Sequence, residues 1–208
     1  SNQNFRQALN YGFDRSATVN AVNPGYKAYN RLVDSNFAGP DGGKFVDEYP
    51  VETVPLSGDV DKAKEYLAAA MEELGYSDVS QLPQLELITW DTSEQKLLLE
   101  TIIDQWKQNL GLENIQLTQY VIGTAIGSFY DLSYDLFAIT WETDVLPTDI
   151  MEAMVTGGEV NYGIWSDAQF DYLVEQAINE LEPDHTAEPT AQDTQNFRDN
   201  AATLTQFK

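Results

Sequence analysis

Residues 134–149 read YDLFAITWETDVLPTD and pass from an apolar segment to an acidic one. The nearly continuous apolar run Leu136–Ile139 predicts that residues 134–141 form a strand covered on both faces. Pro147 lacks the N–H that a strand ladder needs and therefore ends it. In open α/β sheets, ligands bind just beyond the carboxyl ends of the strands, so the segment after this strand is the first candidate for a binding site.

Three residues of this segment are candidate ligand-binding residues: Trp141, Glu142 and Asp144. A large aromatic ring beside carboxylates suits a cationic or peptide-like ligand. The acids of the segment also have a purely structural interpretation, because Asp149 with Glu152 three residues later forms the capping-box pattern of a helix start. From the residues alone, both interpretations stay open.

The length of the chain suits one large α/β domain or two small ones, and its composition supports a substantial core. The chain has 208 residues, of which 42% are hydrophobic, including four Trp, eleven Tyr and nine Phe. Its 34 acidic and 11 basic residues give a net charge of −23, which argues against nucleic acid and anionic membranes as partners. The lack of Cys excludes disulfides and cysteine-ligated metals, and no apolar run approaches the ~20 residues that span a bilayer.

Apolar residues at helical spacing predict helices throughout the chain. The helices at 61–74 and 93–110 are expected to bury stripes that include Leu74 in the first and Trp106 in the second. The expected helices cover residues 4–13, 14–22, 61–74, 93–110, 149–155, 167–181 and 196–207.

Capping residues mark the ends of several of these helices. Asp14 is the expected N-cap of residues 14–22. Capping boxes at two further helix starts are Thr92 with Gln95, and Ser166 with Gln169. Left-handed glycine caps are expected at Gly75 and Gly111.

Two further strands are predicted, at residues 85–90 and 115–121. The helix at 93–110 lies between them in the chain, so the three elements form a βαβ unit with parallel strands and a right-handed crossover. Residues 123–130 are a linker with helical character that leads to the strand at 134–141.

Residues 23–60 have no clear period and read as a long loop excursion rich in Pro and Gly. Such a loop in a compact domain is either functional or a surface excursion. Its aromatic residues either line a ligand face or pin the loop to the core, and pinning is expected for most of them: Tyr26, Tyr29, Phe37, Phe45 and Tyr49.

No motif of the chain specifies an enzyme, a metal site or a cofactor. His185 is the only histidine and lies in the polar, proline-bearing stretch 182–194, where an exposed loop is expected. Glu142 and Asp144 could form the acid pair of a glycosidase, but 34 acids in 208 residues produce such pairs by chance, so this hydrolase hypothesis is the weakest.

The most specific string of the chain is Arg6–Arg15, RQALNYGFDR. It resembles the RQALNYAIDR-type motif of the family-5 solute-binding proteins, which feed oligopeptides, dipeptides and nickel to ABC importers. Other segments follow in the order of that family, and together they cover nearly all of the chain. They are Asp61–Tyr76 (DKAKEYLAAAMEELGY), the strand-helix-strand Leu85–Leu117, Tyr134–Pro147, which resembles YDLxxxGWxADYxDP, and Asn161–Ala177, which resembles NxxGYxNPEFDxLIxxA.

The resemblance implies a fold and a place in a larger protein. In that family these segments form one lobe of a two-lobed binding protein, so residues 1–208 are expected to be a single C-terminal ligand-binding lobe, excised from the N-terminal lobe and the targeting segment. The implied fold is a class II periplasmic-binding-protein-like α/β lobe, with a mixed, mostly parallel sheet flanked by helices. The implied partners are a peptide ligand, the N-terminal lobe and the permease of an ABC importer, without a cofactor. The implied location is extracytoplasmic, in the periplasm or as a cell-surface lipoprotein.

The resemblance also implies roles for individual residues. Asp144 matches the acid that pairs with the N-terminal ammonium of a bound peptide, and Trp141 matches the Trp of the same motif. A loop on the same cleft face is matched by Asn161, Tyr162, Gly163 and Trp165. Val145 and Leu146 stand where the family motif has Tyr and an acid, and the interval is one residue short. That departure favours the alternative hypothesis of a surface interaction or signalling module that kept the fold and lost transport.

Overall fold

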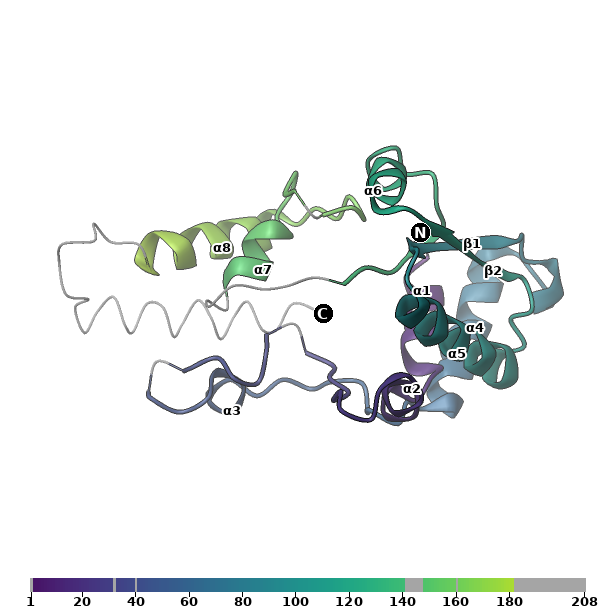
Figure 1. The fold of residues 1–208 in the computed structure, drawn as a ribbon, viewed down its shortest axis with the longest axis horizontal. Coiled ribbons are helices and arrows are strands. Elements are labelled where there is room, and N and C mark those ends of the chain that lie inside the picture. The colour runs from purple at the N-terminus through teal and green to yellow at the C-terminus, as the bar shows by residue number, and fades with distance from the viewer. Residues whose placement is uncertain (1, 32, 40, 141–147, 160, 182–208) are drawn as a thin grey trace. The chain divides into compact units, whose positions relative to one another are not determined.

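The computed structural model describes residues 2–31, 33–39, 41–140, 148–159 and 161–181 (Figure 1). The chain divides into two compact units. The first comprises residues 1–30 and 53–140, and the second comprises residues 31–52 and 141–208. The expectation that residues 1–208 act as a single lobe stays a prediction.

The first unit is built on a parallel sheet with strand order β2-β1-β3. The strands are β1 (Leu85–Trp90), β2 (Ile115–Tyr120) and β3 (Leu136–Phe137). The register places Leu87 opposite Leu117 on one side and opposite Leu136 on the other. The βαβ unit with parallel strands, predicted from the sequence, is therefore confirmed.

The strand predicted at 134–141 is shorter and less buried in the structure. Only β3 pairs as a strand, extended by the Ala138 amide, which donates to the Ile88 carbonyl at 3.0 Å. Its apolar run, 136–139, is only partly buried. The expected cover on both faces was wrong for a positional reason: β3 lies at the edge of the described sheet, whereas the central β1 buries Leu87–Thr89, with Ile88 and Thr89 at 0% exposure.

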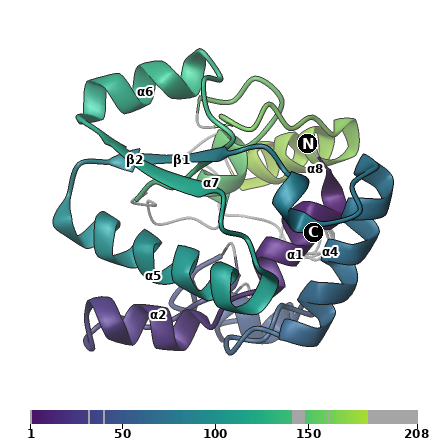
Figure 2. The same ribbon diagram turned by 90° about the vertical axis from the view of Figure 1, so that its right-hand side faces the viewer.

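Helices connect the strands and cover both faces of the sheet. Helix α5 (Ser93–Leu110) joins β1 to β2, and α6 (Ile122–Tyr130) joins β2 to β3, so the predicted linker is a helix. Figure 2 shows α5 and α6 on opposite sides of the sheet. Connections between parallel strands are nearly always right-handed. The β1–β2 and β2–β3 connections run in opposite directions along the sheet, so their helices lie on opposite faces.

The capping residues act largely as predicted. The Thr92 hydroxyl accepts from the Gln95 backbone amide at 3.2 Å, but only this half of the predicted capping box forms, because the Gln95 side chain donates to the Thr140 hydroxyl. Gly75 and Gly111 adopt the left-handed conformation at φ 77° and 72°. Asp14 caps α2 (Arg15–Val22), and the 3-10 helix η1 spans Val79–Gln81. In α4 (Val60–Leu74) the expected burial of Leu74 was wrong: it is 44% exposed, and Met71 fills the core from the preceding turn.

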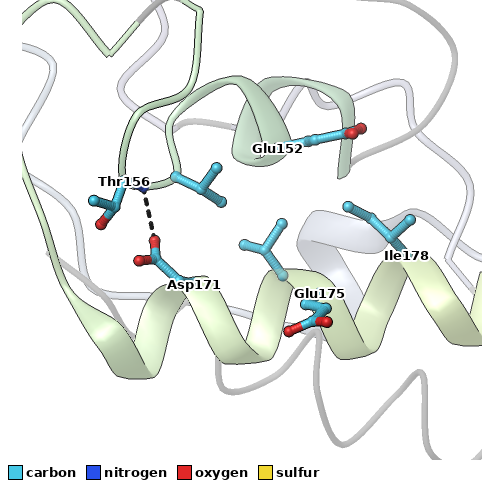
Figure 3. Close-up of a pocket in the computed structure, with 7 residues that line it drawn as sticks. Glu152, Thr156, Asp171, Glu175 and Ile178 are labelled. Atoms are coloured by element: carbon cyan, nitrogen blue, oxygen red, sulfur yellow. Dashed lines mark hydrogen bonds between the residues drawn. The ribbon is translucent and has the colours of Figure 1, made fainter.

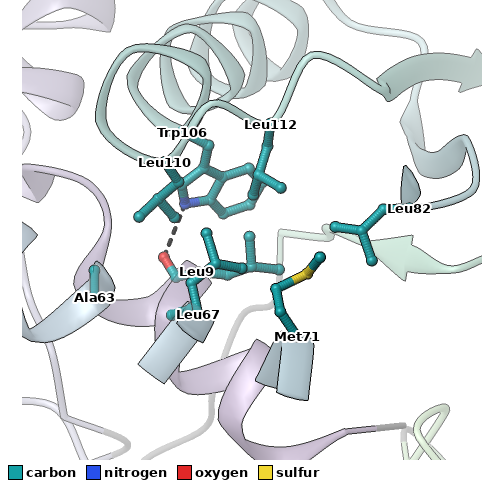
Figure 4. Close-up of a cluster of buried hydrophobic side chains, with 9 residues drawn as sticks. Leu9, Ala63, Leu67, Met71, Leu82, Trp106, Leu110 and Leu112 are labelled. Atoms are coloured by element: carbon teal, nitrogen blue, oxygen red, sulfur yellow. Dashed lines mark hydrogen bonds between the residues drawn. The ribbon is translucent and has the colours of Figure 1, made fainter. Parts of the chain in front are cut away.

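The core of the first unit lies where α1 (Gln3–Tyr11), α4 and α5 meet (Figure 4). The Trp106 indole N–H donates to the Leu9 carbonyl at 2.8 Å inside this core. A buried Trp normally finds such a partner, so the bond fixes the ring while its face packs. The cluster consists of Ala8, Leu9, Ala63, Leu67, Met71, Leu82, Trp106, Leu110 and Leu112.

The second unit packs α8 (Ala168–Leu181) with α7 (Thr148–Ala153) and with the short α3 (Phe45–Glu48). Its buried cluster is Val33, Phe45, Met151, Phe170, Leu173, Val174 and Ala177. Residues 31–52 of the predicted excursion therefore belong to this unit, pinned by Phe45 at 1% exposure. Tyr26 and Tyr29, in contrast, are exposed.

Two predicted helix starts in this unit were wrong by one residue. Helix α7 begins at Thr148, which places Asp149 inside the helix and not at its N-cap. Asp167, not Ser166, caps α8, because its Oδ1 accepts from the amides of Gln169 and Phe170, each at 2.9 Å. Ser166 instead hydrogen bonds to the Thr156 hydroxyl. The predicted loop 182–194 with His185 and the predicted helix 196–207 lie outside the described residues.

Candidate functional site

The topology of the sheet places a switch point at the carboxyl ends of β1 and β3, where a ligand-binding crevice is expected. The chain leaves β1 for β2 on one side and then crosses to β3 on the other side, so the direction of winding reverses between β1 and β3. At such a switch point the two crossover helices lie on opposite faces, and the loops beyond the strand ends separate into a ligand-binding crevice. The segment after residue 139, predicted as the site, follows one of these two strands.

Side chains hold the strand ends at this crevice in place. The Thr89 hydroxyl donates to the Ala138 carbonyl at 2.8 Å, which ties β1 to the segment after β3. The Gln119 amide nitrogen donates to the carbonyls of Trp90 and Thr92, at 3.3 and 3.0 Å. The side-chain amide nitrogen of Gln95 also donates to the Thr140 hydroxyl. A ligand that binds here therefore meets an edge whose backbone is already fixed.

The side chains at this edge include an indole N–H and two acids. Trp90 ends β1, and its Nε1 is buried without a hydrogen-bond partner. Asp91, the next residue, is exposed. The Glu94 carboxylate accepts a hydrogen bond from the Tyr26 phenol, and this bond, together with the carboxylate charge, raises the pKa of Tyr26 above its usual value of 10.0. The edge can therefore attract cationic groups and offers one unused donor.

The residues predicted to anchor the ligand lie outside the described residues: Trp141, Glu142 and Asp144. They follow Thr140 directly in the chain, and their role stays a prediction. The sequence analysis missed Trp90 and Asp91. The strand-end rule that selected residues 141–149 would have selected them as well, had it been applied to the strand at 85–90.

Asn161, a predicted site residue in the second unit, organises its own loop. Its side chain is 8% exposed, and its amide nitrogen donates to the carbonyls of Val155 and Trp165, at 3.0 and 2.6 Å. Its Oδ1 accepts from the Trp165 amide at 3.0 Å. The side chain thus satisfies backbone groups of the loop and shapes it, as buried polar groups generally do.

The other predicted residues of this loop differ in what they present to solvent. Trp165 is 41% exposed and packs edge-on against Phe170, with ring centroids 4.8 Å apart. Ile164 is 65% exposed and has φ 48°, a left-handed conformation that costs a β-branched residue energy. Tyr162 is half-buried and Gly163 is exposed. The loop therefore brings the four predicted residues together and displays an indole face.

A separate hollow of about 300 Å³ lies between α7 and α8 in the second unit (Figure 3). Apolar side chains and three carboxylates line it, and the Asp171 carboxylate accepts from the Thr156 amide at 2.9 Å. Figure 3 shows the carboxylates of Glu152 and Glu175 pointing in different directions. They do not converge as metal ligands, and among the described residues no group of three or more His, Asp or Glu could hold a metal ion.

Comparison with protein families gives a match over most of the chain. The sequence profile of the bacterial extracellular solute-binding proteins, family 5 (Middle), matches residues 1–162. The oligopeptide-binding protein OppA of Bacillus subtilis (strain 168) is 27% identical over 190 residues, and the dipeptide-binding protein DppE of the same strain is 26% identical over 183. These alignments cover 90% and 87% of this chain but 33% and 32% of the relatives, so the chain spans about a third of their length.

Solved structures of peptide-binding proteins share the fold. Listeria monocytogenes OppA bound to peptide matches with a TM-score of 0.79 at 22% identity, over 98% of this chain and 36% of that one. A peptide-binding protein of a peptide ABC transporter matches with a TM-score of 0.78 at 21% identity, over 99% of this chain and 85% of that one. The predicted α/β fold class is confirmed. Among the residues that the structure describes, no helix is both long enough and apolar enough to cross a membrane.

Proposed function

Because the chain belongs to the bacterial extracellular solute-binding proteins of family 5, we propose that it is the ligand-binding lobe of a protein that delivers oligopeptides to an ABC importer. The observation that carries this proposal is the similarity to OppA and DppE along 90% and 87% of the chain. The named ligands of both relatives are peptides. That agreement favours peptide delivery over the alternative of a signalling module.

The crevice at the carboxyl ends of β1 and β3 suits a peptide chemically. A peptide presents a cationic amino terminus and a regular series of carbonyl and N–H groups. The acidic side chains at these strand ends complement the amino terminus of the peptide. The fixed backbone there complements its carbonyl and N–H groups. Recognition through the ligand's main chain tolerates many side chains, which an oligopeptide transporter requires.

Asp144 is the proposed partner of the peptide's N-terminal ammonium, with Trp141 and Glu142 beside it. The support is its position in the motif and its place directly after the segment that pairs with β1. A desolvated carboxylate–ammonium pair is a charge-assisted hydrogen bond and is stronger than a neutral one. Trp165 and its loop, shaped by Asn161, are the proposed second contact, with Tyr162 and Gly163 in the same turn.

The proposed partners are the N-terminal lobe of the same protein, the peptide and the importer's permease. The proposed location of the full-length protein is extracytoplasmic, in the periplasm or as a cell-surface lipoprotein. We assign the chain a binding role without catalysis, in keeping with the description of the family as solute-binding proteins.

Mass spectrometry of the ligand that remains bound to the full-length protein through native purification tests this function. The expected result is a set of masses that fragment as short peptides and disappear after denaturation and refolding. Bound species that are sugars, metal complexes or other compounds without amino-acid fragments would contradict the proposal.

A further inference from the structure

The Trp90 indole N–H is a buried donor without an acceptor. Its Nε1 is inaccessible to solvent and makes no hydrogen bond. An indole nitrogen only donates, so only an acceptor can satisfy it. Buried polar groups are nearly always paired, and an unpaired one in a folded protein needs an explanation such as a binding role.

Three backbone carbonyls at these strand ends already have donors. The Trp90 carbonyl accepts from the Gln119 side chain and from the Thr92 amide, the latter at 2.9 Å. The Ala138 carbonyl accepts from the Thr89 hydroxyl, and the Tyr120 carbonyl accepts from the Asp91 amide at 2.9 Å. None of these hydrogen bonds therefore involves the Trp90 indole N–H, at the end of the central strand.

We propose that Trp90 Nε1 is a ligand-binding donor, which hydrogen bonds to a main-chain carbonyl oxygen of a peptide bound at the carboxyl ends of β1 and β3. The inference rests on the proposed function and adds a residue to its site. Trp90 ends the strand that borders the switch point, which is where a ligand reaches this sheet.

The charge of the surroundings selects a carbonyl over a carboxylate as the acceptor. Asp91 and Glu94 follow Trp90 in the chain, and the protein carries a net charge of −23. An anionic acceptor would be repelled, whereas a neutral carbonyl is not. A peptide offers one carbonyl per residue whatever its side chains, so this contact adds affinity without narrowing the range of peptides. Because Nε1 is buried, the side chains that cover it must move to admit the ligand.

Indole NMR on the full-length protein tests the contact directly. The probe is a pool of random tri- to pentapeptides, added to protein labelled with ¹⁵N at tryptophan and assigned by single Trp→Phe variants. The expected result is a downfield shift of the Trp90 indole proton and slower exchange with water when peptide is bound. Trp106 is the matched control, because its indole already donates to Leu9, and its signal should not move.

Trp90→Phe separates a binding role from a structural one. The variant keeps an aromatic ring but loses the donor together with part of the indole's volume, and the loss of the hydrogen bond should lower peptide affinity about five- to tenfold. The melting temperature without peptide should fall only by the packing that the smaller ring loses, since the lost donor had no partner in the fold. If peptides bind but the Trp90 signal stays fixed, or Trp90→Phe keeps full affinity, the inference is wrong and the proposed function stands. If the pool does not bind to the wild-type protein, the proposed function fails, and the inference fails with it.

Discussion

Polar side chains around the proposed site divide into those that hold the backbone and those that are free to meet a ligand. Thr89 and Gln119 fix the strand ends, and Asn161 fixes the loop of the second unit. Asp91 and the Trp165 ring are exposed. This division predicts that substitutions of the first kind reduce stability, while substitutions of the second kind reduce binding.

Asp144→Asn in the full-length protein should weaken the binding of peptides with a free amino terminus by about 2–5 kcal/mol, because a sequestered ammonium loses its charged partner. Acetylated peptides should lose much less affinity, since they carry no ammonium. Calorimetry with matched free and acetylated peptides measures the difference.

Glu142→Gln is the control for this substitution, because it removes a neighbouring negative charge and leaves the Asp144 carboxylate in place. An equal loss of affinity for free and acetylated peptides, or no loss in Asp144→Asn, would show that the anchor is another group. Glu142 and Asp149 would then be the next candidates.

Asn161→Ala should destabilise the second unit by about 2 kcal/mol, because the carbonyls of Val155 and Trp165 lose their donor in a buried position. Chemical denaturation monitored by Trp165 fluorescence reports the change. Gln169→Ala, at an exposed position, is the control and should stay within about 0.5 kcal/mol of the wild type. Equal stabilities of the two variants would refute the structural role of Asn161.

The first and last residues of an element were predicted correctly where several local sequence signals agree. Strand β1 and helix α5 begin and end where expected, because strand periodicity, the Thr92 cap and the left-handed Gly111 cap coincide there. Ser166 and Asp167 are adjacent cap-forming residues, and the choice between them depends on the contact of Ser166 with Thr156, which is distant in sequence. The length of β3 depends on its edge position, which no local pattern encodes.

A candidate site is easier to select from the sequence than its chemical groups are. The strand-end rule needs only the order of elements, and it selected the segment after β3 from the sequence. The unpaired Trp90 donor depends on which acceptors other residues have already occupied, which only three-dimensional coordinates reveal. Asn161 was selected by resemblance as a ligand contact, yet its hydrogen bonds go to its own loop.

Gly58→Ala should destabilise the junction between α1 and α4 by about 3 kcal/mol. Gly58 has φ 70°, and a Cβ would lie 2.6 Å from the Phe13 carbonyl oxygen and 2.8 Å from that of Tyr11. Left-handed strain adds about 1–2 kcal/mol for a residue with a side chain, and the close contact with backbone adds the rest.

Gly75→Ala separates these two costs, since φ is 77° and no atom lies within 4 Å of the added Cβ. It should cost only about 1–2 kcal/mol, the strain alone. Thermal denaturation of both variants measures the difference, and equal melting temperatures would contradict the account of the junction.

At the scale of the whole molecule, we expect the 208-residue chain to fold on its own, because its helix caps, apolar stripes and βαβ unit agree. Trp106 is fixed by a hydrogen bond and by an edge-on contact with Phe13 at 6.1 Å, so it should give a structured near-ultraviolet circular dichroism signal. A far-ultraviolet helical signal without near-ultraviolet aromatic bands would indicate a molten state and refute this expectation.

The central claim is that this chain supplies one side of a peptide-binding cleft. Titration calorimetry with the same peptide pool, on the full-length protein and on the 208-residue chain, tests it most directly. The full-length protein should bind peptides, and the 208-residue chain should bind them only weakly, because a cleft ligand is buried between two lobes and one lobe supplies part of its contacts and none of the closure. Micromolar or tighter binding to the 208-residue chain alone, or no binding to the full-length protein, would contradict the claim.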